Sequence, residues 1–221
     1  MGKLKSTWWP GSSAHPVGSG WVLCQGAVVR QSCYCWRSRI GTPVDHRRGP
    51  QTDRLILRAF EIDDAEAFYQ LNSTPEVTRY TGEADCPSVE AARAAIEAYP
   101  DFARHGFGRW ATVLGSTGQV IGMTGLKRLE DWNGEVDLGY RFLPEYWGRG
   151  LATEASRAAL QYGFEVIGLE RIIGLVMPDN TASIRVLEKV GMQREKSVRY
   201  DGAPAEQYAI DGTRLRGLTR G

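Results

Sequence analysis

The chain has 221 residues and a formal net charge of +1, with 27 lysines and arginines against 26 aspartates and glutamates. This length suits one domain with a complete hydrophobic core. The balanced charge excludes the overall basic field of a nucleic-acid-binding protein, and no apolar run approaches the ~18 residues of a membrane-spanning helix. We therefore expect neither nucleic acid nor a membrane as partner.

Residues 1–51 differ in character from the rest of the chain. They carry seven basic residues and one acidic residue, and no helical or strand period is sustained up to Pro50. Glycines and prolines interrupt the stretch repeatedly, which is typical of irregular structure. The sequence predicts an irregular extension over residues 1–51, a folded domain over residues 52–212 and a short tail over residues 213–221.

Three of the four cysteines and two of the three histidines lie in this extension. They are His15, Cys24, Cys33, Cys35 and His46. Their spacing does not match the paired ligands of a zinc site, so we predict no metal. Cys86 alone belongs to the domain, which indicates a reducing compartment without disulfides. The apolar residues 21–29 lack a clean cleavage site for export, so a cytoplasmic location is expected.

From Thr52 onwards the chain shows regular periods. Residues 54–60 alternate as a strand, and Asp63 with Asp64 opens a helical stretch. A short second helix is expected at Pro75, and a strong helix follows Ser88. Further strands are predicted over residues 109–114, 120–128, 135–143, 171–176, 195–200 and 205–210, with helices over 151–167 and 181–190. This order predicts a mixed α/β fold with a mostly antiparallel sheet of about seven strands, flanked by helices.

The strand over residues 135–143 leads into a glycine-bearing turn and then into a long helix. A helix N-terminus presents unpaired N–H groups and a partial positive charge, so phosphate oxygens bind there. Gly148 and Gly150 leave room for such a ligand, and Arg149 adds a charge. A dinucleotide-binding fingerprint fits poorly, because Thr153 stands where its third glycine belongs.

Three segments resemble the GNAT superfamily of acyl-CoA-dependent N-acetyltransferases, and specifically its Rim-type branch, which acetylates protein N-termini and small amines. These segments are TDRLILRAF, LGYRFLPEYWGRGLATEA and DNTASIRVLEKVGM. Trp147 stands at the first position of the superfamily's Gln/Arg-x-x-Gly-x-Gly/Ala pattern, and Gly150 and Ala152 match the later ones. The resemblance runs from Asp53 to about Ile210.

The resemblance implies that the strands over residues 135–143 and 171–176 splay apart and that acetyl-CoA lies between them. Backbone amides near Phe142 and Leu143 would pair with the pantetheine arm as an added strand does. The amides of residues 148–152 would bind the diphosphate. The predicted cofactor-binding residues are Phe142, Leu143, Trp147, Gly148, Arg149, Gly150, Leu151, Ala152, Asn180 and Ser183.

The resemblance also suggests catalytic residues. Asp137 stands where the branch carries a glutamate and is the predicted general base, with Glu135 two residues earlier as its substitute. The alternative is that both face solvent and pair with lysines or arginines. Many superfamily members have a tyrosine acid at the place of Leu187, so Ser183 is the substitute candidate. Asn180 could instead serve only as a helix N-cap.

Other side chains have open roles. Trp110, Trp132 and Tyr140 could line an acceptor cleft or belong to the core, and His105, in an expected loop, is assigned no catalytic role. Acceptor selectivity is expected in residues 81–88 and 128–134, which carry no motif.

We predict an N-acetyltransferase that moves the acetyl group of acetyl-CoA to a primary amine by direct attack in a ternary complex, as a monomer or homodimer. The acceptor is a protein N-terminal α-amine or a small-molecule amine. The alternatives are an acetyltransferase for amino acids, polyamines or antibiotics, and a non-catalytic acyl-CoA-binding regulatory module.

Overall fold

The computed structural model describes residues 44–81 and 85–218, which contain one eight-stranded sheet. The strand order is β1-β2-β3-β4-β5-β6-β8-β7, and every neighbouring pair is antiparallel except β5 and β6. The predicted mixed α/β fold with a mostly antiparallel sheet is therefore confirmed. The strands are β1 (Arg48–Gln51), β2 (Leu55–Arg58), β3 (Arg109–Leu114), β4 (Val120–Leu129), β5 (Glu135–Phe142), β6 (Arg171–Val176), β7 (Gln193–Tyr200) and β8 (Ala203–Asp211).

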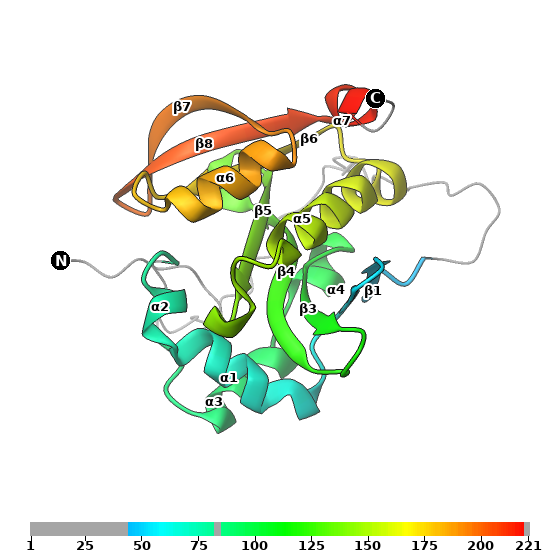
Figure 1. The fold of residues 1–221 in the computed structure, drawn as a ribbon, viewed down its shortest axis with the longest axis vertical. Helices are drawn as coiled ribbons and strands as arrows, with labels where there is room; N and C mark the ends of the chain where they lie inside the picture. The colour runs from blue at the N-terminus through cyan, green and yellow to red at the C-terminus, as the bar shows by residue number, and fades with distance from the viewer. Residues whose placement is uncertain (1–43, 82–84, 219–221) are drawn as a thin grey trace, which may run out of the picture.

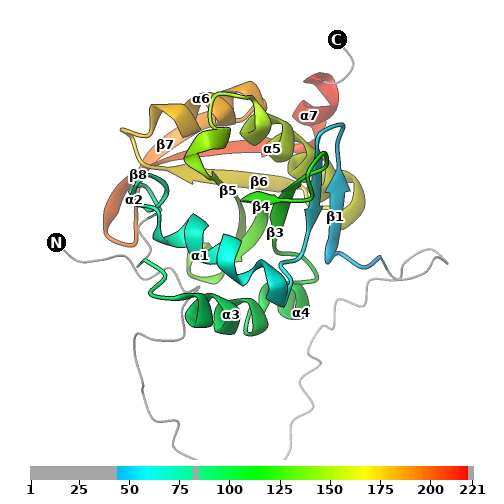
Figure 2. The same ribbon diagram turned by 60° about the horizontal axis from the view of Figure 1, so that its bottom comes forward.

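Helices cover both faces of this sheet. Figure 2 shows α5 and α6 on one side and α1 and α3 on the other. The helices are α1 (Ala65–Ser73), α2 (Pro75–Thr78), α3 (Val89–Glu97), α4 (Asp101–His105), α5 (Leu151–Tyr162), α6 (Thr181–Lys189) and α7 (Gly212–Leu218). Short 3-10 turns lie at Ile62–Asp64, Glu130–Trp132 and Pro144–Tyr146, and α5 continues as a π-helical turn over Gly163–Ile167.

The core has two main layers because successive side chains of a strand point to opposite faces. Trp110 packs with Leu160 of α5 in one layer, while its neighbour Ala111 packs with Phe68 of α1 in the other. In Figure 1, β7 and β8 run across the top of the view with α6 in front of them, whereas β3 and β4 run down it. The parallel pair β5 and β6 joins these two parts.

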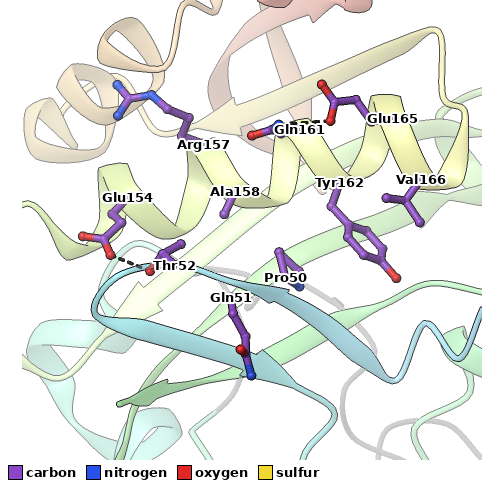
Figure 3. Close-up of a pocket in the computed structure, with 10 residues that line it drawn as sticks. All are labelled: Pro50, Gln51, Thr52, Glu154, Arg157, Ala158, Gln161, Tyr162, Glu165 and Val166. Atoms are coloured by element: carbon purple, nitrogen blue, oxygen red, sulfur yellow. Dashed lines mark hydrogen bonds between the residues drawn. The ribbon is translucent and has the colours of Figure 1, made fainter. Parts of the chain in front are cut away.

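The first turn of α5 is tied to the segment that enters β2. The Thr52 hydroxyl donates a hydrogen bond to Oε1 of Glu154 at 2.5 Å (Figure 3), and Nε of Arg54 donates to Oε2 at 2.7 Å. A second nitrogen of Arg54, Nη1, donates to the carbonyl oxygen of Arg149 at 3.1 Å. These contacts hold the turn before α5 and the start of the helix as one unit.

The folded part begins earlier than residue 52. Residues 48–51 form β1, which pairs with β2, and the indole Nε1 of Trp110 donates to the carbonyl of His46 at 2.8 Å. A Cβ at Gly49 would lie 2.9 Å from the Trp110 ring, so glycine is needed for this close approach, and an edge strand tolerates Pro50. That composition hides the strand from a periodicity analysis.

The predicted boundaries change accordingly at both ends. Residues 44–51 belong to the fold, whereas residues 1–43 lie outside the described part, so an irregular extension there stays a prediction. The predicted tail from residue 213 is helical as far as residue 218 in α7.

A pair of truncations tests the new boundary. A variant that begins at Thr52 should melt roughly 5 °C below one that begins at Val44, because it loses β1 and the acceptor of the buried Trp110 indole. An unpaired buried donor costs about 1–3 kcal/mol, and a domain of this size shifts by about 2–4 °C per kcal/mol. Scanning calorimetry of the two variants measures the difference, and equal melting temperatures would contradict a structural role for residues 44–51.

The Glu154 contacts predict a pH-dependent contribution to stability. Burial alone raises the pKa of the Glu154 carboxyl, but the hydrogen bonds from Thr52 and Arg54 and the charge of Arg54 outweigh it and lower the pKa. A carboxyl whose folded pKa lies below its unfolded value of about 4.3 stabilises the fold above that value. This contribution is lost as the pH falls through the folded pKa.

Glu154→Gln should therefore lower the melting temperature at neutral pH, and its gap to the wild type should be narrower at about pH 3, below the ordinary range of a glutamate pKa. Thermal melts by circular dichroism at both pH values measure the gap. Glu97→Gln, at an exposed position of α3, is the matched control and should show little gap at either pH. A Glu154→Gln gap of the same size at both pH values would refute the linkage.

Candidate active site

A cleft opens where β5 and β6 part. The two strands have a single register pair, Asp137 with Ile173. Beyond it, residues 138–142 of β5 and residues 175–177 at the end of β6 line opposite sides of a cleft of about 510 Å³. The splayed pair that the resemblance implied is thus present in the structure.

Most of the predicted cofactor-binding residues line this cleft. They are Phe142, Trp147, Gly148, Gly150, Leu151, Ala152, Asn180 and Ser183. Arg149 and Leu143 are not among the lining residues. The guanidinium of Arg149 lies over the Tyr146 ring, 5.4 Å from its centroid.

The glycine turn has the geometry of an anion site. Gly148 and Gly150 have φ values of 73° and 75°, which disfavour any side chain. Gly150 is the N-cap of α5 and no side chain caps the helix there. The nearest atom to a Cβ placed on Gly150 is Nη2 of Arg54, at 3.8 Å, and nothing lies within 4 Å of one on Gly148. Open space therefore lies over the unpaired amides of the first helical turn.

Leu143 does not lie at the cleft edge as predicted. Its amide donates to the carbonyl of Ile121 in β4 at 3.0 Å, and its side chain is buried in the layer of α1. Because backbone groups alternate between the two neighbours of a strand, the amides of Tyr140 and Phe142 face β6 instead. The Phe142 carbonyl accepts a hydrogen bond from the indole Nε1 of Trp147 at 2.7 Å.

Asp137 lies at the point where the strands separate. Its residue is 7% exposed, and its Oδ2 accepts from Nη2 of Arg109 at 2.7 Å. Its Oδ1 accepts from the backbone amide of Leu175 in β6 at 3.1 Å. Burial raises the pKa of the Asp137 carboxyl, and the charge of Arg109 and the Leu175 hydrogen bond offset this only in part. A role as general base stays a prediction.

Glu135 pairs with an arginine, which is the alternative to a catalytic role that the sequence left open. Its carboxylate pairs with Arg171 at 3.3 Å, and Arg171 also pairs with Glu195 at 2.6 Å. Glu135 is not a lining residue of the cleft. We therefore assign this side chain to an ion-pair network across β5, β6 and β7.

Ser183 and Tyr140 meet at the α6 side of the cleft. The Tyr140 hydroxyl donates to the carbonyl oxygen of Ser183 at 2.9 Å, and burial raises the pKa of this phenol above its ordinary value. The Asn180 side chain accepts from the Ser183 amide at 3.1 Å, so it caps α6 and lines the cleft at once. Leu187, at the position of the superfamily tyrosine, is buried against Gly174.

The remaining aromatic candidates separate into cleft and core. Tyr140 lines the cleft, whereas Trp110 is fully buried in the core. Trp132 stacks edge-on against Tyr200 and donates to the Gln207 side chain at 3.2 Å. His105 ends α4 rather than lying in a loop, and its Nε2 is 3.4 Å from a carboxylate oxygen of Glu130.

Sequence reasoning missed several lining residues. Arg185 and Lys189 of α6 reach the cleft from positions four apart, the spacing of one helix face. Further lining comes from α2 and the residues just after it and from the β7–β8 hairpin, segments that carry no motif. These residues are Glu76, Val77, Tyr80, Thr81, Tyr200, Asp201, Ala203, Pro204 and Ala205. Of the two loops expected to select the acceptor, the lining includes Thr81 and Leu129, and residues 82–84 lie outside the described part.

A second hollow of about 390 Å³ lies between β1 and α5 (Figure 3). It contains none of the predicted site residues. Within residues 44–81 and 85–218, no cluster of three or more His, Cys, Asp or Glu side chains could hold a metal ion. No helix in the same ranges is long and apolar enough to cross a membrane.

Comparisons with known proteins agree with this geometry. Residues 54–193 match the family model described as an acetyltransferase (GNAT) domain. An uncharacterised N-acetyltransferase of Bacillus subtilis (strain 168), YoaA, is 38% identical over 150 residues, which are 67% of this chain and 85% of the relative. A spermidine N(1)-acetyltransferase of Escherichia coli (strain K12) is 27% identical over 159 residues, covering 72% and 83%.

The fold also matches solved structures. A GNAT-family acetyltransferase from Bacillus anthracis superposes with a TM-score of 0.62 at 29% sequence identity, covering 73% of this chain and 96% of that one. The family match spans most of the described residues and includes β5, the glycine turn and α5. The chain belongs to the GNAT family of acetyltransferases.

Proposed function

We propose that this acetyltransferase takes acetyl-CoA as its acetyl donor and a primary amine as its acceptor, most favourably a protein N-terminal α-amine or a small-molecule amine. The observation that supports this is the continuity of the cleft. It runs from the wedge between β5 and β6 to the glycine turn at the N-terminus of α5. A diphosphate on the turn would leave the pantetheine arm extended along the β5 edge, as in strand addition.

The reaction forms a C–N bond and breaks the C–S bond of the thioester. The acceptor must attack as a neutral amine, and its proton must leave. At neutral pH an α-amine with a pKa near 7.8 loses only about 1 kcal/mol to protonation, whereas a lysine-like amine near 10.4 loses about 4.6 kcal/mol. The leaving thiolate has a pKa of ~8.5 by analogy with cysteine, so an acid helps little. The buried Leu187 in place of a tyrosine is therefore compatible with catalysis.

A polyamine is the second candidate acceptor. Glu76 and Asp201 bring carboxylates to the acceptor side of the cleft, and a relative is named as a spermidine acetyltransferase. A non-catalytic acyl-CoA-binding module is the candidate from another class, supported by the lost tyrosine position. Release of free thiol from acetyl-CoA, measured against peptides, polyamines and aminoglycosides, separates the three.

The glycine turn supplies a test of donor binding. Saturating acetyl-CoA should raise the melting temperature by roughly 5–10 °C, since a ligand at 100 times its Kd contributes about 2.7 kcal/mol. Gly150→Glu should abolish this shift, because its carboxylate would lie where the diphosphate binds.

Gly118→Glu is the matched control, since Gly118 also has a positive φ of 72° and open space around a Cβ. It should be destabilised similarly and keep the ligand shift. A folded Gly150→Glu protein with an undiminished shift would overturn the donor assignment.

The pH profile of the preferred acceptor tests its class. With an α-amine, kcat/KM should rise with pH and level off near pH ~8, whereas with a polyamine it should climb until about pH 10. Initial rates of thiol release, with acetyl-CoA saturating and each acceptor well below its KM, measure this. A preferred acceptor whose rate stays level from about pH 6 upward would contradict rate control by amine deprotonation.

A further inference from the structure

The contact between Asp137 and Leu175 occupies the place of a sheet hydrogen bond. In a parallel pair of strands, the backbone N–H and C=O of one residue bond to the two residues that flank its register partner. Ile173 is the partner of Asp137, so its backbone groups bond to residues 136 and 138. If the pairing continued, the Leu175 amide would next donate to the Leu138 carbonyl. It donates instead to Oδ1 of the Asp137 side chain at 3.1 Å.

We infer that Asp137 is a positioning residue that holds β5 and β6 apart, with its carboxylate standing in for the Leu138 carbonyl. A buried N–H group needs an acceptor. The carboxylate supplies one from a side chain, so the Leu175 amide stays satisfied while the β5 backbone stands away from β6. The inference rests on the proposed binding of acetyl-CoA in this cleft.

Arg109 holds the carboxylate in this position. It reaches Asp137 from β3, two strands away, at 2.7 Å. The register aligns Arg109 with Gly125 and Gly125 with Gly139, so two glycines lie along its path. A Cβ at Gly139 would overlap the Arg109 guanidinium, so that glycine is what lets the side chain pass.

The consequence is a pair of backbone groups left for a ligand. The Leu138 carbonyl loses its donor on β6, and the Tyr140 amide, which faces the same side, loses its acceptor. Leu138 and Tyr140 both line the cleft. An extended ligand with amide groups, such as a pantetheine arm, can pair with them as a strand would. In this role both Asp137 oxygens accept hydrogen bonds from the protein.

Two double variants test this without leaving a buried charge unpaired. Arg109→Met/Asp137→Asn keeps an oxygen that can accept from the Leu175 amide. Arg109→Met/Asp137→Leu has nearly the same shape but no acceptor. Calorimetric titration with acetyl-CoA should show binding about tenfold weaker for the leucine variant than for the asparagine variant, the effect expected for one lost hydrogen bond. The KM for acetyl-CoA should differ likewise, and the pH profile of kcat/KM for the asparagine variant should keep the shape of the wild-type profile.

A crystal structure of the leucine variant without ligand supplies a readout independent of binding. We expect the β5–β6 pairing to extend, with the Leu175 amide donating to the Leu138 carbonyl. The control Arg58→Met/Asp64→Asn removes an ion pair of 2.6 Å that lies outside the cleft. It should lower the melting temperature and leave the affinity for acetyl-CoA unchanged.

The outcomes distinguish the inference from the proposed function. Equal acetyl-CoA affinities in the two double variants, or strands that stay apart in the leucine variant, would overturn the positioning role. Equal affinities with kcat/KM defects confined to low pH would identify Asp137 as a general base instead. A wild type that fails to bind acetyl-CoA would overturn the proposed donor, while the structure of the leucine variant would still decide whether Asp137 separates the strands.

Discussion

The parting of β5 and β6 is the constraint on which the rest of the site depends. A sheet interior has no water to satisfy backbone groups, so two strands that separate must find other partners for their amides and carbonyls. Here side chains provide some of them. The Trp147 indole bonds the Phe142 carbonyl, and the Asp137 carboxylate accepts from the Leu175 amide. The cleft is therefore part of the folded sheet, and some of its backbone polar groups already have hydrogen-bond partners without a ligand.

Different side-chain contacts hold the two ends of the cleft in place. At one end, Thr52 and Arg54 bind Glu154 in the first turn of α5, so the glycine turn keeps its position relative to β2. At the other, Asn180 caps α6 and the Tyr140 hydroxyl joins β5 to that helix. In the proposed complex with acetyl-CoA, the diphosphate and the thioester lie at opposite ends of one ligand, so fixing both ends of the cleft would set where the acetyl group is presented.

The sequence predicted the elements with strong periods and the caps whose chemistry is local. The helices after Gly150 and Asn180 are of this kind. The sequence did not reveal which amides of β5 face the cleft, because successive backbone amides point to opposite edges of a strand. The amide of Leu143 was therefore predicted to face the cleft, whereas it faces β4. Asp137 and Arg109 are 28 positions apart in the sequence, on β5 and β3. Their contact can therefore be seen only once the strand register is known. β1 was missed because Gly49 serves packing rather than periodicity.

The state of Asp137 bears on which acceptor the cleft can use. The Asp137 carboxylate already accepts from Arg109 and Leu175, and burial raises its pKa. In the positioning role that we infer it takes no proton from the acceptor, so the neutral amine arises from the amine's own ionisation. The cleft lining carries charges of both signs, from Arg109, Lys127 and Arg141 and from Glu76, Asp137 and Asp201. Nearby positive charges lower the pKa of a bound amine and nearby negative charges raise it, so the two sets oppose each other. With these opposed charges the intrinsic pKa of the acceptor weighs most, and an α-amine starts within about one unit of neutral pH, whereas a lysine-like amine starts more than three units above it.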